Sequence, residues 1–526
     1  MRRFVLYLIP AISGLAGDVT YDRILNAARE PGNWLTYSGS YASQHHSALD
    51  QLDRRNIAGL RMKWVYQTRT TAKFETTPLV VDGVMYLTSP PNDVIALDIG
   101  TGRAFWQYRR TLPDPINVCC GRVNRGVATL GDRLYMGTVD GFLMALDART
   151  GSVLWEVPVA DRRSGHSLTA APLALKDKIV TGVAGGEYGV RGFLDAYDPQ
   201  SGKRLWRFYT VPAPGEPGSE TWKGDAWKTG GAPTWITGSY DPALNLLYWG
   251  TGNPSPDWNG DVRPGDNLYS SSVIALNPDD GKLKWHFQFT PHDVHDWDAV
   301  QIPVLVDTEW KGRARKLMYW ANRNSFFYVL DRETGEFLRG EPFARQTWAK
   351  GLDEKGRPVR VPGMLPSPQG TLVYPGVQGG TNWYSPSYSP KTGLFYMSVW
   401  EYASIYYSGD APYSPGNRFI GSSPQGVPDE PGSGGVRAID PLTGKRIWDF
   451  PLVSKPQSGI LSTAGGIVFG GDDEGNFFAL DDRTGKELWR AATGGPIIAA
   501  PITYLHKGKQ LVSIAAGNSI FTFGLE

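Results

Sequence analysis

The sequence has little of three things: cysteine, charge of one sign and long apolar runs. Only two of its 526 residues are cysteines, and they are adjacent. No C-x-x-C-H motif is present, which excludes a covalently attached c-type haem within this sequence. The 53 Lys and Arg balance 52 Asp and Glu to a net charge of +1, without a long run of one sign, so we expect no nucleic-acid partner. Past the N-terminus no apolar run approaches the roughly 18 residues of a membrane span, so we expect none.

The N-terminus combines positive charge with a short apolar run. It reads MRRFVLYLIPAISGLAGDVTYD, with an apolar stretch from Phe4 to about Ala16 and small residues before Asp18. This order is typical of a secretory signal peptide, so we predict one over residues 1–17 and export to the periplasm. A buried first strand stays an open alternative, because the run is short and has no A-x-A cleavage site. Residues 18–526 are expected to form a single domain.

The composition favours strands and tight turns. The sequence contains 63 Gly, 39 Pro, 19 Trp and 25 Tyr. Gly and Pro mark turns, whereas aromatic residues favour strands. We therefore predict an all-β fold with few long helices.

A repeated motif organises the chain. It reads as an apolar strand that ends in Asp or Asn, a turn closed by Gly, and a second strand that carries Trp. The Asp can cap the turn, and the Gly supplies its positive φ. In the fifth copy Arg339 replaces the Trp. The seven copies are ALDIGTGRAFW (96–106), ALDARTGSVLW (145–155), AYDPQSGKRLW (196–206), ALNPDDGKLKW (275–285), VLDRETGEFLR (329–339), AIDPLTGKRIW (438–448) and ALDDRTGKELW (479–489).

The spacing of these copies predicts a β-propeller. Most recur at about 40 to 50 residues, the length of a four-stranded blade. With a degenerate hairpin, SYSPKTGLFYMSVW (387–400), they predict eight blades with tryptophan docked between them. The C-terminal strands QLVSIAAGNSIFTFGL (510–525) are expected to complete a blade with MKWVYQT (62–68) and so close the ring. The Gly- and Pro-rich segments 211–220 and 422–435 are interpreted as surface loops.

The segment PHDVHDWDAV (291–300) concentrates ligand-bearing side chains. Asp296 and Asp298 are two residues apart, so on an extended segment their carboxylates face the same side, where repulsion favours a bound cation or a shared proton. His292 and His295 have an H-x-x-H spacing that suggests zinc, but no nearby cysteine or helical pattern supports it. A solvated acidic turn is the other alternative.

Cys119 and Cys120 admit two interpretations. Neighbouring Cα atoms lie about 3.8 Å apart, so a bridge would close a strained eight-membered ring, and such strain tends to mark a site. The alternative is a pair of reduced, buried thiols, which is less expected in an exported protein.

Several motifs together resemble one enzyme family. Besides the Trp-ending repeats they are NVCCGRVNRG (117–126), GGEYGVRGFLDAYD (185–198), GTGNPSPDWNGDVRPGDNLYSSSV (250–273) and TPHDVHDWDAV (290–300). In combination they look like a quinoprotein alcohol dehydrogenase of the methanol and ethanol dehydrogenase type. The resemblance runs from about Trp34 to the C-terminus, and it implies an eight-bladed propeller that uses pyrroloquinoline quinone (PQQ) and a metal ion.

The resemblance implies a role for each matched position. The adjacent cysteines are implied to form a disulfide that stacks on one face of the quinone, with Trp235 on the other. Arg125 is implied to pair with a quinone carboxylate. The implied cofactor-binding residues are Glu75, Cys119, Cys120, Arg125, Thr169, Ala184, Gly185, Gly186, Trp235, Arg323 and Asn382. The implied metal ligands are Glu187, Asn253, Asp296 and Asp298.

This ligand set suits a hard cation, because it offers carboxylate, amide and quinone oxygens. In the family, an Asp two residues after the catalytic Asp, here Asp296, accompanies lanthanide use. Asp298 occupies that position and therefore favours a lanthanide, with Ca²⁺ as the alternative. Taken alone, Glu187 is a turn carboxylate paired with Arg191, and Asn253 is a turn residue before proline.

Three places depart from the family pattern. His295 stands where the family usually has Trp, which changes the cavity wall or adds a pH-sensitive group beside the catalytic base. Ala184 replaces a Ser. The segment PQSGILSTAGG (456–466) lacks the Trp often found before its glycines.

The implied activity is oxidation of a small, primary alcohol to an aldehyde. Asp296 is predicted to be the general base that takes the hydroxyl proton, and Arg323 to orient it. Without a haem motif, the expected electron acceptor is a separate soluble cytochrome c. Two alternatives stay open: a sugar, polyol or aldehyde dehydrogenase on the same fold, and a non-catalytic envelope scaffold built from the same repeats. A homodimer is also left open.

Overall fold

The computed structural model describes residues 17–526. Residues 1–16, and with them all but the last residue of the predicted signal peptide, lie outside the described residues. Within the described range the helices are short: α1 (Tyr21–Leu25) and the 3-10 turns η1 (Ala27–Arg29), η2 (Ile57–Gly59), η3 (Arg162–Ser164), η4 (Gly186–Tyr188), η5 (Ser219–Thr221) and η6 (Ala226–Thr229). None of these helices is long and apolar enough to cross a membrane. The remaining secondary structure is strand, as predicted.

Seven sheets of four antiparallel strands and one sheet of five make up most of residues 17–526. Five of the four-stranded sheets follow each other directly along the chain. The first three consist of β3 (Leu79–Val81), β4 (Val84–Ser89), β5 (Asp93–Asp98) and β6 (Ala104–Tyr108); of β7 (Ala128–Leu130), β8 (Arg133–Gly137), β9 (Phe142–Asp147) and β10 (Val153–Pro158); and of β11 (Leu173–Ala174), β12 (Ile179–Gly182), β13 (Phe193–Tyr197) and β14 (Arg204–Tyr209). The next two consist of β15 (Ser239–Asp241), β16 (Leu246–Gly250), β17 (Ser272–Leu276) and β18 (Leu283–Gln288); and of β19 (Val304–Trp310), β20 (Arg313–Ala321), β21 (Phe326–Asp331) and β22 (Phe337–Pro342).

The remaining large sheets combine segments that are more distant in sequence. The first consists of β26 (Ser387–Ser389), β27 (Leu394–Glu401), β30 (Ser433–Ile439) and β31 (Arg446–Leu452). The second consists of β32 (Leu461–Thr463), β33 (Ile467–Gly471), β34 (Asn476–Asp481) and β35 (Glu487–Ala492), with β1 (His46–Ser47) added in parallel to β32. The third consists of β36 (Ile502–His506), β37 (Lys509–Ala516) and β38 (Ser519–Gly524), with β2 (Arg61–Gln67) as its fourth strand. Two small sheets, β23 (Ala349–Leu352) with β24 (Pro358–Arg360), and β25 (Thr371–Val373) with β28 (Ser404–Tyr406) and β29 (Gln425–Gly426), fill the insertion before β30.

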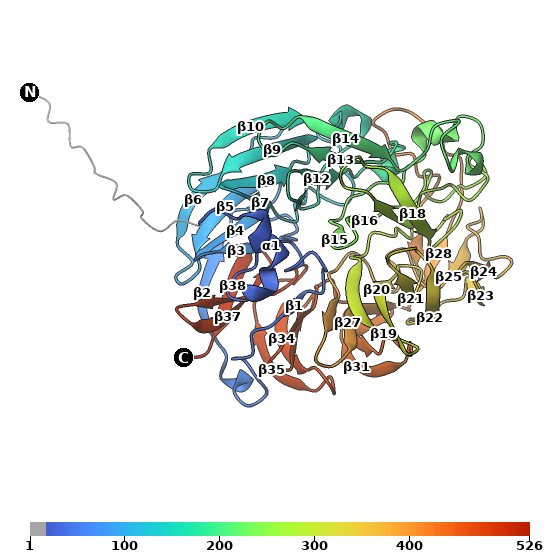
Figure 1. The fold of residues 1–526 in the computed structure, drawn as a ribbon. Helices are drawn as coiled ribbons and strands as arrows, with labels where there is room; N and C mark the ends of the chain where they lie inside the picture. Colours follow the sequence, from blue (N-terminus) through green and yellow to red (C-terminus); the bar gives the residue numbers. More distant parts are fainter. Residues whose placement is uncertain (1–16) are drawn as a thin grey trace, which may run out of the picture.

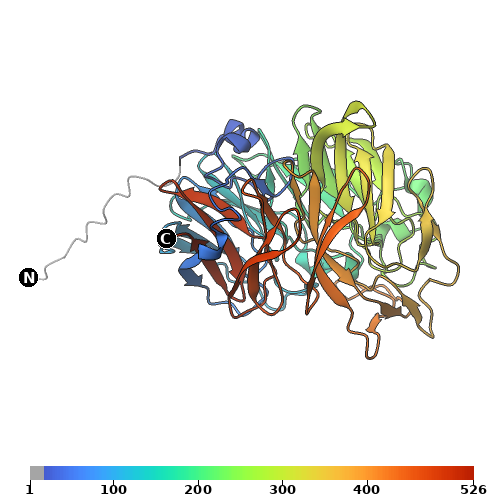
Figure 2. The same cartoon turned by 90° about the horizontal axis from the view of Figure 1, so that it is seen from below.

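The sheets follow one another around a common centre, in the order of the chain (Figure 1). First strands of neighbouring sheets contact each other at β7 and β11, β15 and β19, and β26 and β32, which places them on the inside. The ring is closed by β2, which pairs antiparallel with β38 from the other end of the chain. Figure 2 shows these N-terminal and C-terminal strands together at one side of the molecule. The predicted pairing of segment 62–68 with the C-terminal strands is therefore confirmed.

Tryptophan docks each repeat onto the next. Trp64 Nε1 donates to Ile99 O at 2.9 Å, and the indole covers Gly102, where a Cβ would lie 2.6 Å from the ring. The same donor bond to the following repeat turn is made by Trp106, Trp155, Trp206 and Trp448. Trp489 donates to Leu60 O, just before β2. Trp285 covers Gly335, but its Nε1 has no hydrogen-bond partner within the described residues. Gly102 has a φ of +71°, so both its conformation and its contact require glycine. The contact between neighbouring repeats thus depends on the fit of the indole over the turn glycine as well as on the hydrogen bond.

The fifth repeat uses arginine for the hydrogen bond but not for the whole contact. Arg339 Nη1 donates to Thr443 O at 2.8 Å, whereas Gly444 of that turn is covered mainly by Glu341, whose Cγ would lie 2.6 Å from a Cβ there, with Arg339 Cδ at 3.8 Å. The aliphatic stem of arginine can cover a turn while its head forms hydrogen bonds.

One part of the repeat interpretation is wrong. The degenerate hairpin 387–400 was predicted to represent a blade of its own, but it forms β26 and β27, the first two strands of the sheet that holds the sixth repeat, because β27 pairs with β30. The sheet completed by β2, in contrast, contains no copy of the repeat. The hairpin differs from the repeats in that nothing lies within 4 Å of a Cβ at its turn glycine, Gly393.

Strand direction separates the ring into two ends. In an antiparallel sheet, the turn between the third and fourth strands lies at one end, whereas the loop between the second and third strands and both inter-sheet connections lie at the other. Every repeat turn connects a third strand to a fourth. All repeat turns are therefore at one end, which we call the turn end. The opposite end, formed by longer and irregular connections, we call the loop end.

Candidate active site

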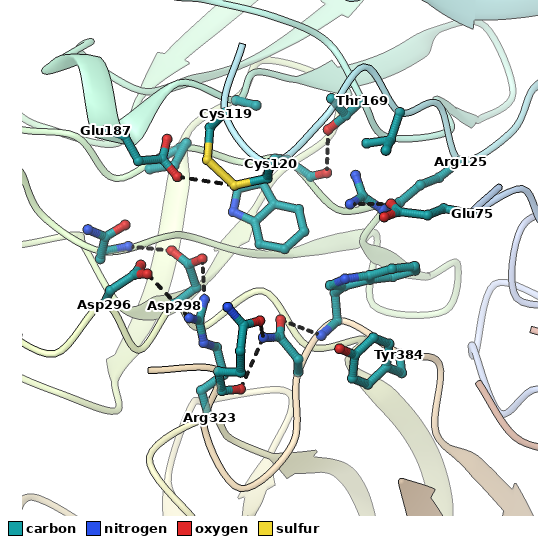
Figure 3. A pocket seen from close by; sticks show the side chains of 18 of the residues that line it. Glu75, Cys119, Cys120, Arg125, Thr169, Glu187, Asp296, Asp298, Arg323 and Tyr384 are labelled. Atoms are coloured by element: carbon teal, nitrogen blue, oxygen red, sulfur yellow. Dashed lines mark hydrogen bonds and ion pairs between the residues drawn. A yellow bond between two sulfur atoms is a disulfide. The ribbon is translucent and has the colours of Figure 1, made fainter. Parts of the chain in front are cut away.

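One cavity at the loop end collects the predicted site residues, and all of them except Gly186 line it. Several are placed by connections between sheets: Glu75, Cys119, Cys120, Arg125, Thr169, Trp235, Asp296, Asp298 and Asn382. The others are placed by loops between second and third strands: Ala184, Gly185, Glu187, Asn253 and Arg323. Figure 3 shows side chains from these separate segments pointing toward one another.

Arg323 bridges the two aspartates that the 291–300 segment presents. Its Nη1 donates to Asp298 Oδ2 at 2.6 Å, and its Nη2 lies 3.4 Å from Asp296 Oδ2. The loop is shaped by Asp293, whose carboxylate accepts the backbone N–H groups of His295 and Trp297 at 3.1 and 2.8 Å. Asp296 and Asp298 both contact Arg323, as expected for carboxylates on the same side, although the segment is not extended as assumed, because Asp296 has a φ of +60° (Figure 3).

Asn253 and Glu187 bring further oxygen atoms to the same wall. The backbone N–H of Asn253 donates to Asp298 Oδ1 at 2.7 Å. The side-chain oxygen of Asn253 faces Gly186, where a Cβ would lie 3.4 Å from it. Glu187 follows in η4 and lines the cavity. Arg191, the partner considered for Glu187 as a simple turn residue, pairs with Glu216 at 3.3 Å instead.

Burial raises the pKa of each acidic group in this cluster. For Glu187 burial, followed by repulsion from Asp298, raises the pKa to about 7. Burial holds the pKa of Asp296 well above its usual range, with Arg323 opposing and Asp298 adding to the shift. The pKa of Asp298 is raised by burial too, despite its bonds to Arg323 and Asn253. A cation among these oxygens would offset both the desolvation and the mutual repulsion.

A second charged pair lies further along the cavity. Arg125 Nη2 and Glu75 Oε2 are 2.7 Å apart, and both side chains are buried. The guanidinium carbon of Arg125 lies 5.0 Å from the ring centre of Trp235 and 4.4 Å from that of Trp383. Within the described residues, Arg125 Nε and Nη1 have no hydrogen-bond partner. Buried guanidinium donors without partners fit an anionic ligand.

Cys119 and Cys120 form a disulfide in the cavity wall. Of the two interpretations of this pair, the bridged one is therefore correct. The sulfur of Cys120 lies 3.8 Å from Glu187 Oε1, so the disulfide adjoins the acidic cluster (Figure 3). Although the two sulfurs and Glu187 Oε1 are grouped within 4.8 Å, disulfide sulfurs carry no thiolate charge and do not form a thiolate metal site.

The remaining predicted positions are structural parts of the wall. Thr169 O accepts the backbone N–H of Arg125 at 3.1 Å. Asn382 donates to Gln378 Oε1 at 2.9 Å and accepts the N–H of Trp383 at 2.8 Å. Gly185 has a φ of +121°, and a Cβ there would lie 2.3 Å from Gly165 O. Gly186 lies just behind the wall.

The two histidines of the loop do not face the cavity. His295 is buried, with Nε2 2.9 Å from Met364 O and its ring stacked on Trp297 at 4.3 Å. Burial lowers its pKa to about 3, so it is neutral at ordinary pH, and the expectation of a pH-sensitive group beside the base is wrong. His292 Nδ1 contacts Gly265 O at 2.8 Å. Because the histidines bind different carbonyls, H-x-x-H is not a zinc site here.

Sequence reasoning missed several residues of the site. The cavity is also lined by Lys73, Val123, Pro233, Gln378, Trp383, Tyr384 and Gln457. Behind the wall, Asp257 Oδ1 accepts from Asn253 Nδ2 at 3.0 Å. A signal for Asp257 existed, because it follows Asn253 by four residues in the matched GTGNPSPDWNG motif. Trp383 is next to Asn382, but nothing in the sequence placed Gln457 near them.

Comparisons with known proteins agree with this geometry. The model of the glucose/ethanol/alcohol dehydrogenase β-propeller domain matches residues 34–340, and a model described as outer membrane protein assembly factor BamB matches residues 432–524. Quinoprotein alcohol dehydrogenase PedH of Pseudomonas putida is 40% identical over 98% of this chain and 91% of its own. A lanthanide-dependent methanol dehydrogenase of Methylacidiphilum fumariolicum is 38% identical over 96% and 89%.

Solved structures give the same result. Quinohemoprotein alcohol dehydrogenase ADHIIG of Pseudomonas putida superposes with a TM-score of 0.92 at 36% identity, over 98% of this chain and 83% of the other. A europium-containing methanol dehydrogenase gives a TM-score of 0.90 at 34% identity, over 96% and 100%. BamB from Moraxella catarrhalis, at 15% identity and a TM-score of 0.51, shares the fold alone. The chain belongs to the family of PQQ-dependent quinoprotein alcohol dehydrogenases.

Proposed function

We propose that this protein is an exported, periplasmic enzyme that oxidises a small primary alcohol to an aldehyde, with PQQ and a metal ion held in the loop-end cavity. The observation that carries the proposal is the convergence of an Asp296–Arg323 pair, oxygen ligands and a partly unpartnered Arg125 in one cavity. The near-full-length similarity to alcohol and methanol dehydrogenases supports the substrate class. The disulfide and the N-terminal sequence pattern support export.

We interpret the seven four-stranded sheets and the five-stranded sheet as eight blades of a closed propeller. The support is the antiparallel pairing of β2 with β38, which leaves no gap between the ends of the chain. A closed ring removes free sheet edges and brings loops from many sheets to one place.

The residues present fit the quinone. PQQ is a flat, negatively charged polycarboxylate, and the cavity offers the unpartnered Nε and Nη1 of Arg125, the indole of Trp235 and the disulfide. The residues that would hold it are Glu75, Cys119, Cys120, Arg125, Thr169, Ala184, Gly185, Gly186, Trp235, Arg323 and Asn382.

The residues present also fit a hard cation. Carboxylate and amide oxygens are offered by Glu187, Asn253, Asp296 and Asp298. Burial and mutual repulsion raise the pKa values of the three acidic groups, and a bound cation would reduce both effects. The extra carboxylate of Asp298 favours a lanthanide over Ca²⁺, because attraction grows with the charge of the ion. The europium-containing and lanthanide-dependent relatives support this choice.

Asp296 is the group placed to take the proton of the alcohol hydroxyl. Its carboxylate reaches the cavity, whereas both oxygens of Asp298 are engaged, by Arg323 and by the Asn253 backbone. Arg323 keeps Asp296 oriented, and its own position is fixed by the carbonyl of Val377, which accepts from Nη2 at 2.6 Å. When bound, the quinone supplies the two-electron acceptor for the carbinol hydrogen and the metal supplies a Lewis acid. A soluble cytochrome c is the proposed final acceptor.

Reconstitution tests this function. Metal-free protein is incubated with PQQ and either Ca²⁺ or La³⁺, and reduction of an artificial dye is followed with primary alcohols, aldehydes, polyols and sugars. We expect the highest kcat/KM with a primary alcohol and with La³⁺. Faster turnover of a sugar, polyol or aldehyde would change the substrate class. No dye reduction with any substrate, and no bound quinone, would contradict the enzyme and favour a binding scaffold.

A further inference from the structure

Asp257 is a buried carboxylate behind the cavity wall. It is 1% exposed and does not line the cavity. Its Oδ1 accepts from Asn253 Nδ2 at 3.0 Å, whereas its Oδ2 has no hydrogen-bond partner within the described residues. A buried carboxylate oxygen without a partner is costly, so its presence calls for a compensating charge nearby.

The contact with Asp257 fixes the orientation of the Asn253 amide. The Nδ2 group of Asn253 faces two acceptors, Asp257 Oδ1 at 3.0 Å and Pro254 O at 3.3 Å. A flipped amide would place its oxygen against both acceptors. The oxygen must therefore face the opposite way, toward Gly186 and the turn that carries Glu187.

The loop that carries Asp257 is held by Arg263, which is completely buried. Its guanidinium donates to Pro256 O at 2.9 Å, to Asn267 Oδ1 at 2.8 Å and to Asp293 O at 2.6 Å. Arg263 thus ties the 253–267 loop to the 291–300 loop that presents Asp296. With both loops anchored, the Asp257 carboxylate cannot easily move away from the cluster.

We propose that Asp257 is a positioning residue of the metal site, one that holds the Asn253 oxygen toward the turn that carries Glu187 and adds a fourth negative charge that favours a trivalent ion over a divalent one. Burial, followed by repulsion from Glu187, holds the pKa of Asp257 well above its usual range, so its negative charge is favoured only where a bound cation offsets that cost. Attraction to an ion rises with ion charge, and burial reduces the screening of that attraction. The inference rests on the proposed function, because it requires a metal at the predicted ligands.

Binding of Tb³⁺ and Ca²⁺ to the full-length, metal-free protein tests this role without reference to activity. Tb³⁺ luminescence excited through the protein's tryptophans gives the Tb³⁺ affinity directly, and displacement of Tb³⁺ gives the affinity for Ca²⁺. The variants are Asp257→Asn, which is nearly isosteric, and Asp140→Asn as a matched control. Asp140 is buried and paired with Arg110, which keeps Glu156 as a second partner.

We expect Asp257→Asn to weaken Tb³⁺ binding by about 10-fold or more, and Ca²⁺ binding by less, as for other residues that support metal ligands. Asp140→Asn should leave both affinities at the wild-type values. If Asp257→Asn loses the wild-type thermal transition, Asp257→Ser is judged by the same ratio. An unchanged Tb³⁺ affinity, or an unchanged Tb³⁺ to Ca²⁺ ratio, overturns the role of Asp257 alone. Wild-type protein that binds neither ion overturns the proposed metal site as well.

Discussion

The two ends of the ring are built on different principles. At the turn end, a similar contact recurs between sheets: a side chain covers a glycine turn, and most of the repeat tryptophans, or Arg339 in the fifth repeat, donate to a backbone carbonyl of the neighbouring sheet's turn. At the loop end, backbone bonds such as those from Val159 N–H to Gly141 O and from Thr210 N–H to Gly192 O also recur, but each connection contributes a different side chain to one cavity. The repeated turns therefore form the scaffold, whereas the irregular loops form the site.

This division separates stability from chemistry. Turn-end residues bury aromatic surface and contribute to unfolding free energy, but they do not line the cavity. Loop-end residues such as Asp296 and Arg125 are ionisable and buried, which is unfavourable for folding stability but provides a reactive environment. Substitutions at the turn end should therefore lower the unfolding free energy, whereas substitutions at the loop end should lower turnover.

The largest expected effect is at the loop end, on turnover. Asp296→Asn removes the proposed base without removing volume, so turnover should fall by about 10²- to 10⁴-fold. The thermal unfolding midpoint should not fall. Steady-state dye reduction by the reconstituted variant measures the first quantity and calorimetry the second, with Asp140→Asn as the control. Turnover within a factor of two of wild type would remove Asp296 from the mechanism.

The next effect is at the turn end, on stability. Trp206→Ala deletes an indole that is 9% exposed, covers Gly281 and donates to Pro278 O at 2.8 Å. We expect a loss of about 3 to 5 kcal/mol of unfolding free energy, measured by urea denaturation. The remaining folded enzyme should keep wild-type turnover. A drop in turnover at unchanged stability would break the separation of the two ends.

A buried histidine of the scaffold should make stability depend on pH. His45 is completely buried, with Nε2 2.9 Å from Pro501 O, and burial lowers its pKa to about 4. The unfolded chain, with a histidine pKa of about 6.5, binds the proton first. The contribution of His45 is therefore complete above about pH 6.5 and is lost as pH falls toward 4, by about 3 kcal/mol in total.

The matched variant for this pH effect is His45→Gln, which has no titrating group. Its unfolding free energy should decline less steeply than that of wild type over the same pH window. Identical slopes for the two proteins would show that His45 is not the source.

The smallest effect is expected at the repeat that uses arginine. Arg339 is partly exposed and contributes a single hydrogen bond to Thr443 O, so Arg339→Ala should cost about 1 kcal/mol. Comparison with Trp206→Ala by the same denaturation assay measures the advantage of tryptophan. If Arg339→Ala lowers the unfolding free energy as much as Trp206→Ala does, the type of side chain at this site between two sheets matters less than the presence of a contact there.

Much of the fold could be predicted from the sequence, because the repeat leaves a visible period. The exception was the hairpin 387–400, whose composition resembles a repeat. What distinguishes it is the uncovered turn at Gly393 and the bond from Trp400 Nε1 to Pro456 O, both tertiary features that sequence spacing does not show.

The site could be predicted only where motifs are specific. The positions from Glu75 to Asn382 were matched through family resemblance, and the structure brings all but Gly186 to the cavity wall. His295 was misjudged because its burial depends on Met364 and Tyr406 from distant segments. Gln457 was missed because no local pattern indicates which aperiodic loop folds over a cavity.

The central claim is that the loop-end cavity oxidises an alcohol with its own bound quinone, and a single-turnover experiment tests it most directly. Protein reconstituted with PQQ and La³⁺ is mixed anaerobically with a primary alcohol in the absence of dye, and the aldehyde formed is measured against bound quinone. We predict one aldehyde per bound quinone, with a matching change in quinone absorbance, and none for Asp296→Asn. Bound quinone that yields no aldehyde in the wild-type protein would contradict the account.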